Sequence, residues 1–166
     1  MILTIVLVDL YRHYVAKNSF SRAYVLIAGI AGLLPDADVP LSWFVSFFNS
    51  TSVWLHRTYT HAVVWAALFA LIAIVIHFHP KMNYFKFTRK QTTLFFAMLS
   101  VGWLMHVILD CSISGSETIS WIPLIAQIGF CPRWITDPNV AAGLDAIILL
   151  AWLIHEETKH YIRDYF

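Results

Sequence analysis

Three short segments of the sequence gather acidic and imidazole side chains. They read LPDAD at residues 34–38, HRTYTH at 56–61 and HVILD at 106–110. Carboxylate oxygens and imidazole nitrogens are common ligands of divalent transition-metal ions. Only 13% of the residues are charged and 59% are hydrophobic, so ionisable groups would often have to be placed near hydrocarbon, where they are costly. The pattern predicts a metal site built between membrane helices.

The first segment places Asp36 and Asp38 two residues apart, between Pro35 and Pro40. The prolines predict a rigid turn after an apolar helix, and two carboxylates in one turn favour a cation. The alternative is a solvated turn that ends one helix and uses an aspartate to cap the next.

The second segment places His56 and His61 five positions apart, which on a continuous helix is a rotation of about 140°. The two rings would share a site if a helix began near Thr58 or Thr60, with that threonine as its cap. Arg57 would then stand at a helix N-terminus, where an anion is favoured. The alternative is a histidine pair that anchors the helix at the membrane interface.

The third segment places His106 and Asp110 four residues apart, which predicts one shared helix face. The pair could ligate one ion or form a carboxylate-oriented imidazole, and a structural hydrogen bond between helices is the alternative. Asp9 and His13 repeat the spacing in reverse order. They either extend to the site along a tilted helix or form a separate polar pair with Arg12.

The composition is that of a membrane protein. The mean hydropathy is +0.67, and aromatic residues make up 16% of the chain. The formal net charge of +1 argues against a nucleic-acid partner, because there is no basic stripe to neutralise phosphates. The length fits one domain over residues 1–166.

The hydrophobic pattern predicts an all-α, polytopic membrane bundle of about five transmembrane helices. The 23 residues 58–80 and the 19 residues 91–109 contain no Asp, Glu, Lys or Arg, so either comes close to the roughly 30 Å that a bilayer core requires. The predicted helices cover residues 2–16, 22–34, 58–80, 91–109 and 139–155. The first two form a hairpin and are less certain as full spans.

Two apolar segments, 39–54 and 118–130, are interrupted by prolines or glycine, so they are predicted as short interfacial or re-entrant pieces. Cys111 and Cys131 would lie on the same side of the membrane as the acidic and imidazole segments. A disulfide between them and a pair of unpaired thiols are both open.

Basic residues give the bundle an orientation. Arg57 and Arg133 would lie on one side, and the other side would carry Lys17, Arg22, Lys81, Lys86, Arg89, Lys90, Lys159 and Arg163. Positive residues concentrate on the cytoplasmic side of membrane proteins. The sequence therefore predicts an extracytoplasmic N-terminus, a cytoplasmic C-terminus and a site that opens on the extracytoplasmic side.

In their order and spacing, the three motifs, together with the later Gly115 and Trp121-Ile122-Pro123, resemble the YdjM-like, LexA-regulated membrane-bound metal-dependent hydrolases. The match runs from about Asp9 to Pro123. The resemblance implies a membrane hydrolase related to zinc-dependent phospholipase C, with Arg57 as a phosphate contact. The implied metal ligands are Asp36, Asp38, His56, His61, His106 and Asp110. His13 is a further candidate, although the family's early histidine stands near the start of its first helix.

Six to eight nitrogen and oxygen ligands exceed what one tetrahedral zinc requires, so one to three ions are expected, with manganese or iron as alternatives to zinc. Asp36 or Asp110 could instead accept a proton, and Arg57 could stabilise charge on a phosphoryl group. The predicted function is hydrolysis of a phosphoester, such as a membrane lipid phosphoester. A non-enzymatic metal-binding or metal-transport protein is the alternative.

Overall fold

The computed structural model describes residues 2–48, 59–79, 87–114, 119–123, 126–128 and 131–160. This part of the chain is mainly helical, with one small antiparallel sheet. The predicted site residues His56 and Arg57 lie outside the described residues, so their roles remain predictions.

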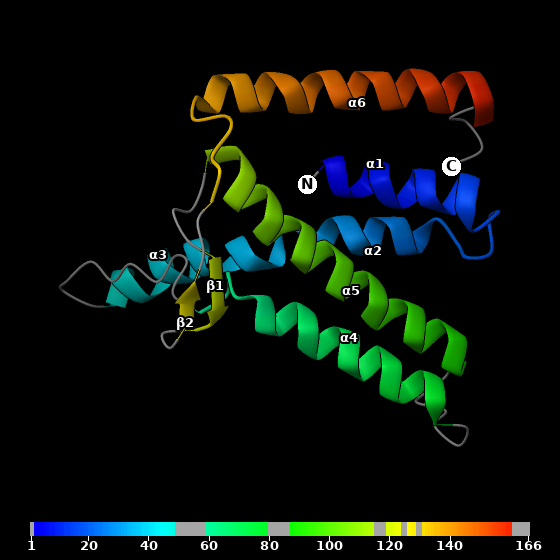
Figure 1. Ribbon diagram of the computed structural model, residues 1–166, viewed down its shortest axis with the longest axis horizontal. Coiled ribbons are helices and arrows are strands. Elements are labelled where there is room, and N and C mark those ends of the chain that lie inside the picture. The colour runs from blue at the N-terminus through cyan, green and yellow to red at the C-terminus, as the bar shows by residue number, and fades with distance from the viewer. Residues whose placement is uncertain are drawn as a thin grey trace.

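Within the described residues, six α-helices form the body of the protein (Figure 1). Their bounds are α1 Ile2–Leu10, α2 Ala23–Ala31, α3 Asp38–Phe48, α4 Val63–Phe78, α5 Arg89–Leu109 and α6 Pro138–His160. Three short turns extend or join them: the π-helical η1 Tyr11–Val15, the 3₁₀-helical η2 Leu34–Ala37 and the π-helical η3 Asp110–Ser114. In Figure 1, α6 runs along the top, α1 and α2 lie beneath it, and α5 crosses them with α4 below.

Helix α5 packs on both α2 and α4. Gly102 allows the close approach to α2, because a Cβ at this position would lie 2.3 Å from the carbonyl oxygen of Ala28 and 2.6 Å from the Cβ of Ala31. On the α4 side, Trp103 and Val107 pack in a small core with Ala66. Both contacts lie within two turns of the end of α5, where the third motif begins.

The number of membrane spans is smaller than predicted, as judged from the described residues. By length and composition, α5 with its extension and α6 can each cross a membrane, and α2 with α3 would make a third span bent by 48°. Helix α4 has 16 residues, so it rises only about 24 Å. It is short because Tyr59 to Ala62, which were predicted within the span, are not helical. The five-helix span count is therefore not confirmed.

The two segments predicted as interfacial pieces have regular structure of their own. Helix α3 begins at Asp38 and passes through Pro40, which stands in the first turn, where its missing N–H has no intrahelical partner to lose. Strands β1 (Ile119–Ile122) and β2 (Ala126–Ile128) pair antiparallel, with Ile119 opposite Ile128. This hairpin is an exception to the all-α prediction, although the fold remains overwhelmingly helical.

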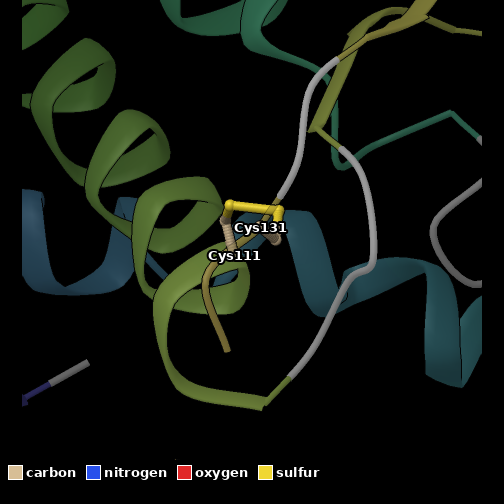
Figure 2. The surroundings of a disulfide bond; sticks show 2 residues. All are labelled: Cys111 and Cys131. Atoms are coloured by element: carbon tan, nitrogen blue, oxygen red, sulfur yellow. A yellow bond between two sulfur atoms is a disulfide. The ribbon is translucent and has the colours of Figure 1, made fainter. Parts of the chain in front are cut away.

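A disulfide joins Cys111, in η3, to Cys131, in the segment before α6 (Figure 2). The backbone N–H of Arg133 also donates to the Cys111 carbonyl oxygen at 3.4 Å. The end of α5 is thereby tied to the chain that leads into α6. Of the two alternatives for these cysteines, the structure shows the bonded pair.

Candidate metal centre

Asp36, His61 and His106 bring three potential ligand atoms together at one end of the bundle. The Nε2 atom of His61 lies 3.2 Å from Oδ1 of Asp36 and 3.2 Å from Nε2 of His106. The distance from His106 Nε2 to the same Asp36 oxygen is 3.6 Å. The three residues come from η2, from the segment before α4 and from α5, one from each sequence motif.

His106 is oriented by a backbone carbonyl. Its Nδ1 atom lies 2.7 Å from the carbonyl oxygen of Gly32, which follows α2. A carbonyl oxygen can only accept, so Nδ1 carries the proton of the neutral ring and Nε2 keeps its lone pair. Gly102 lies one turn earlier on α5 and permits the approach to α2 on which this bond depends.

His61 is oriented by a threonine and an aspartate. The Thr60 hydroxyl donates to Oδ2 of Asp38 at 2.6 Å, and its oxygen lies 3.1 Å from Nδ1 of His61. The single hydroxyl proton is already used, so Thr60 accepts from Nδ1–H and the Nε2 lone pair faces the site. Asp38 was predicted as a ligand, but it approaches His61 from the Nδ1 side, at 3.6 Å. In this arrangement Asp38 positions His61 through Thr60.

The predicted threonine cap is wrong. Helix α4 begins at Val63, and its N-cap residue Ala62 is extended and makes no side-chain capping bond. Thr60 precedes this N-cap residue by two positions, and its hydroxyl donates to Asp38. Its backbone is held by α5 instead, since the indole N–H of Trp103 donates to the Thr60 carbonyl oxygen at 3.0 Å.

The geometry of the three ligand atoms fits a metal ion. The two Nε2 lone pairs face each other, and such an arrangement of acceptors repels unless a cation or a proton lies between them. Two ligands bound to one tetrahedral zinc at 2.0–2.1 Å lie about 3.3 Å apart. The observed separations of 3.2, 3.2 and 3.6 Å among Asp36, His61 and His106 are close to that value. Three protein ligands would also leave a fourth position open.

Asp110 lies at the margin of this centre. Its Oδ2 atom is 3.7 Å from Nε2 of His61, but it is not among the three ligand groups that lie within 4.8 Å of one another. The Asp110 side chain is 25% exposed and that of Asp36 47%. Both carboxylates line a cavity of about 350 Å³, together with His106. The centre therefore opens to a space that could hold a substrate.

His13 belongs to a second polar group. Asp9, His13 and Glu156 also place three ligand atoms within 4.8 Å of one another. Thr4 lines the cavity at the first centre, and His13 stands nine residues further along, a rise of about 13 Å. The proposal of one shared site that includes His13 is therefore not supported by this arrangement. The second group ties the end of the first helix to α6.

Neighbouring protein side chains surround the polar atoms of the second group. Nη1 of Arg12 lies 2.9 Å from Nε2 of His13, and a guanidinium can only donate. The proton of the neutral His13 ring is therefore on Nδ1, directed at Asp9 and Glu156, each 3.7 Å away. The indole N–H of Trp152 donates to Asp9 at 3.1 Å. No Nδ1 lone pair is left for a metal in this arrangement.

Charge leads to the same conclusion. Asp9 and Glu156 are each 1% exposed, and Arg12 lies 3.6 Å from Asp9. Arg12 carries one positive charge, and Asp9 and Glu156 carry one negative charge each, so the formal charge of the group is −1. A single proton would bring this charge to zero, whereas a divalent ion would make it +1. The group is best described as a buried ion network. Sequence reasoning missed Glu156 because its partners are more than 140 residues away and it stands in an ordinary Glu-Glu pair.

The described residues include two helices, or three with the bent pair, that are long and apolar enough to cross a membrane. A group of histidine and carboxylate side chains lies at one end of the fold. These features are those of a polytopic membrane protein with a potential metal site. The model of the YdjM inner membrane protein family matches residues 2–162. The chain therefore belongs to the YdjM inner membrane protein family, as the motifs predicted. No match was found among curated proteins, and none among solved structures.

Proposed function

We propose that the chain is a membrane-bound, metal-dependent hydrolase of phosphoesters. The observation that supports this most is the convergence of two imidazole lone pairs and one carboxylate at the separations of a tetrahedral centre. The preference for nitrogen and oxygen ligands favours zinc, with manganese or iron as alternatives. The adjoining cavity supplies room for a substrate.

Asp36, His61 and His106 would hold the ion, and Gly32 and Thr60 would keep the two rings in the ligating tautomer. A bound divalent ion lowers the pKa of a water and polarises a phosphoryl oxygen. Asp110, whose Oδ2 atom lies 3.7 Å from Nε2 of His61, would accept the proton of the attacking water. One P–O bond would form to the water oxygen and another P–O bond would break, and the proton taken up by Asp110 would pass to the oxygen of the leaving alcohol.

The site is proposed to face away from the cytoplasm. In the described chain the end opposite the centre carries Lys17, Arg22, Arg89, Lys90 and Lys159, and Lys90 donates to the Ser19 carbonyl oxygen across that end. The centre's own end carries the disulfide. Positive residues favour the cytoplasmic side and disulfides favour oxidising compartments.

The experiment compares Asp110→Asn with Asp137→Asn. Asp137 caps α6, with its carboxylate accepting from the Asn139 N–H at 2.8 Å, and it lies outside the cavity. Detergent-purified protein is analysed for bound metal and assayed on a panel of phosphoesters. Asp110→Asn should keep the metal and lose on the order of a hundredfold or more in turnover, and Asp137→Asn should keep both. Metal-loaded wild type that hydrolyses no phosphoester would refute the proposal.

Arg57 is proposed as the phosphate contact, on the sequence alone. Arg57→Lys should retain metal and lower kcat/KM by about 1 to 3 kcal/mol in free-energy terms, because lysine cannot make the two-pronged contact of a guanidinium. Unchanged hydrolysis of every phosphoester tested would remove this role.

A metal carrier is the alternative function. A carrier would need a second cation site toward the other side of the membrane, and the Asp9–His13–Glu156 group is the observation that would favour one. Arg12 within that group argues for an ion network instead. Metal uptake into proteoliposomes, lost on Glu156→Gln, would support the carrier.

A further inference from the structure

The cavity beside the metal centre also includes the first half of α6. Its wall is formed by residues from α1, from η2 and the two residues before it, from α5 with η3, and from α6. Asp36, His106 and Asp110 contribute from the centre, and Asp145 contributes from α6. At about 350 Å³ the cavity is at the small end of ligand pockets. It suits the head group of a lipid better than its acyl chains.

Two polar side chains of this cavity have no hydrogen-bond or ion-pair partner among the described residues. Thr4 is 1% exposed, and its hydroxyl makes no hydrogen bond. Asp145 is partly buried in the middle of an apolar helix, and the described part of the chain offers it neither a hydrogen bond nor an ion pair. A buried hydroxyl needs a partner, and a carboxylate in a membrane helix needs a cation. Both needs point to a ligand in the cavity.

A cation at Asp145 would be separate from an ion held by Asp36, His61 and His106. Asp145 does not belong to either set of three ligand groups in the described chain, so its carboxylate is not placed to bind the same ion as Asp36, His61 and His106. A molecule that puts a phosphoryl group at the centre and a positive charge at Asp145 would interact with both acidic parts of the cavity wall. An ammonium group close to a phosphodiester has this chemistry.

We propose that Asp145 selects an ammonium-bearing phosphodiester, which in a membrane is the head group of an ethanolamine-type phospholipid. The inference rests on the proposed hydrolase function and names its substrate class. Asp145 is a specificity residue here, and Thr4 supplies a hydrogen bond to the same head group.

The test uses the full-length, metal-loaded protein with phosphatidylethanolamine and phosphatidylglycerol of identical acyl chains. Wild type should prefer the ethanolamine lipid. Asp145→Asn should lower kcat/KM for that lipid on the order of tenfold to a hundredfold, the loss expected for one charge-assisted contact, and leave the glycerol lipid within about twofold. Asp145→Lys should reverse the preference. Glu157→Gln, an exposed acid on the same helix, is the matched control and should change neither rate.

Binding of both lipids is measured alongside turnover. Ethanolamine-lipid binding that depends on Asp145, without hydrolysis, would support the head-group site and refute the hydrolase. Hydrolysis of both lipids with no preference, or equal rates in Asp145→Asn, would overturn the head-group site and leave the hydrolase standing. Loss of bound metal in Asp145→Asn would also overturn it, because Asp145 would then be a ligand.

Discussion

The protein contains two histidine and carboxylate groups of similar composition at opposite ends of its first hairpin. In the Asp36–His61–His106 group both rings donate outward, to Gly32 and Thr60, and turn their lone pairs inward. In the Asp9–His13–Glu156 group a guanidinium takes the lone pair of the ring.

Exposure separates the two groups as well. The Asp36 side chain is 47% exposed, whereas Asp9 and Glu156 are each 1% exposed. An open group with inward lone pairs can accept an ion from outside, and a closed group with its own cation holds two helices together. The hydrogen bonds behind the ligands, more than the ligand types, therefore distinguish a binding site from a structural network.

The largest expected effect is loss of the metal from one group only. His106→Ala should abolish stoichiometric metal binding and hydrolysis, because it removes one of three ligands. His13→Ala is the matched substitution in the other group and should leave metal content unchanged. Elemental analysis of both purified variants checks this contrast, and equal metal loss in the two would show that the groups act as one.

The next effect is on stability. Arg12→Met should lower the free energy of unfolding by about 3 to 5 kcal/mol, because it leaves buried carboxylates without their cation. Arg89→Met, an exposed arginine at the start of α5, should have little effect. Denaturant unfolding in detergent measures both. A stable Arg12→Met protein that has lost its metal would contradict the structural role.

Replacing Cys111 and Cys131 by serine tests how much the disulfide stabilises the end of the bundle that holds the Asp36–His61–His106 group. Removal of a cross-link that spans 20 residues should lower the free energy of unfolding by about 3 kcal/mol. Reductant should shift the unfolding of wild type by the same amount and leave the double variant unaffected. A wild type insensitive to reductant would contradict the disulfide.

The smallest effect concerns the contact that orients His106. Gly102→Ala should cost about 1 to 3 kcal/mol through overpacking and should weaken metal binding, since its Cβ would meet the backbone of α2. Gly143→Ala on α6 is the control, because nothing lies within 4 Å of its Cβ position. Unchanged metal affinity in Gly102→Ala would show that His106 does not depend on this helix crossing.

The sequence predicted the Asp36–His61–His106 group better than the Asp9–His13–Glu156 group. Three local motifs named Asp36, His61 and His106, and the family resemblance is confirmed by the family model. Local spacing does not reveal which residue contacts the far side of a ring, so it did not predict that Asp38 accepts from Thr60 on the Nδ1 side of His61. Local spacing also missed Glu156, whose partners are distant in sequence.

The count of five spans is not confirmed, for a related physical reason. A run of residues without charge predicts a membrane helix of full length. Four residues of one such run, Tyr59 to Ala62, form the non-helical approach to α4, and the backbones of Tyr59 and Thr60 accept hydrogen bonds from Trp65 and Trp103. A hydropathy pattern does not distinguish such a non-helical apolar segment from the first turn of a membrane helix.

The residues of the two groups are completed at different times during synthesis, because of their order in the chain. Asp36, His61 and His106 have all been made once the ribosome has passed residue 110, whereas Glu156 belongs to the last helix. Polypeptides generally assemble from the N-terminal side as they are made. The candidate ion-binding group can therefore form while α6 is still being made, whereas the contacts of Glu156 with Asp9 and His13 can form only after α6 has been made.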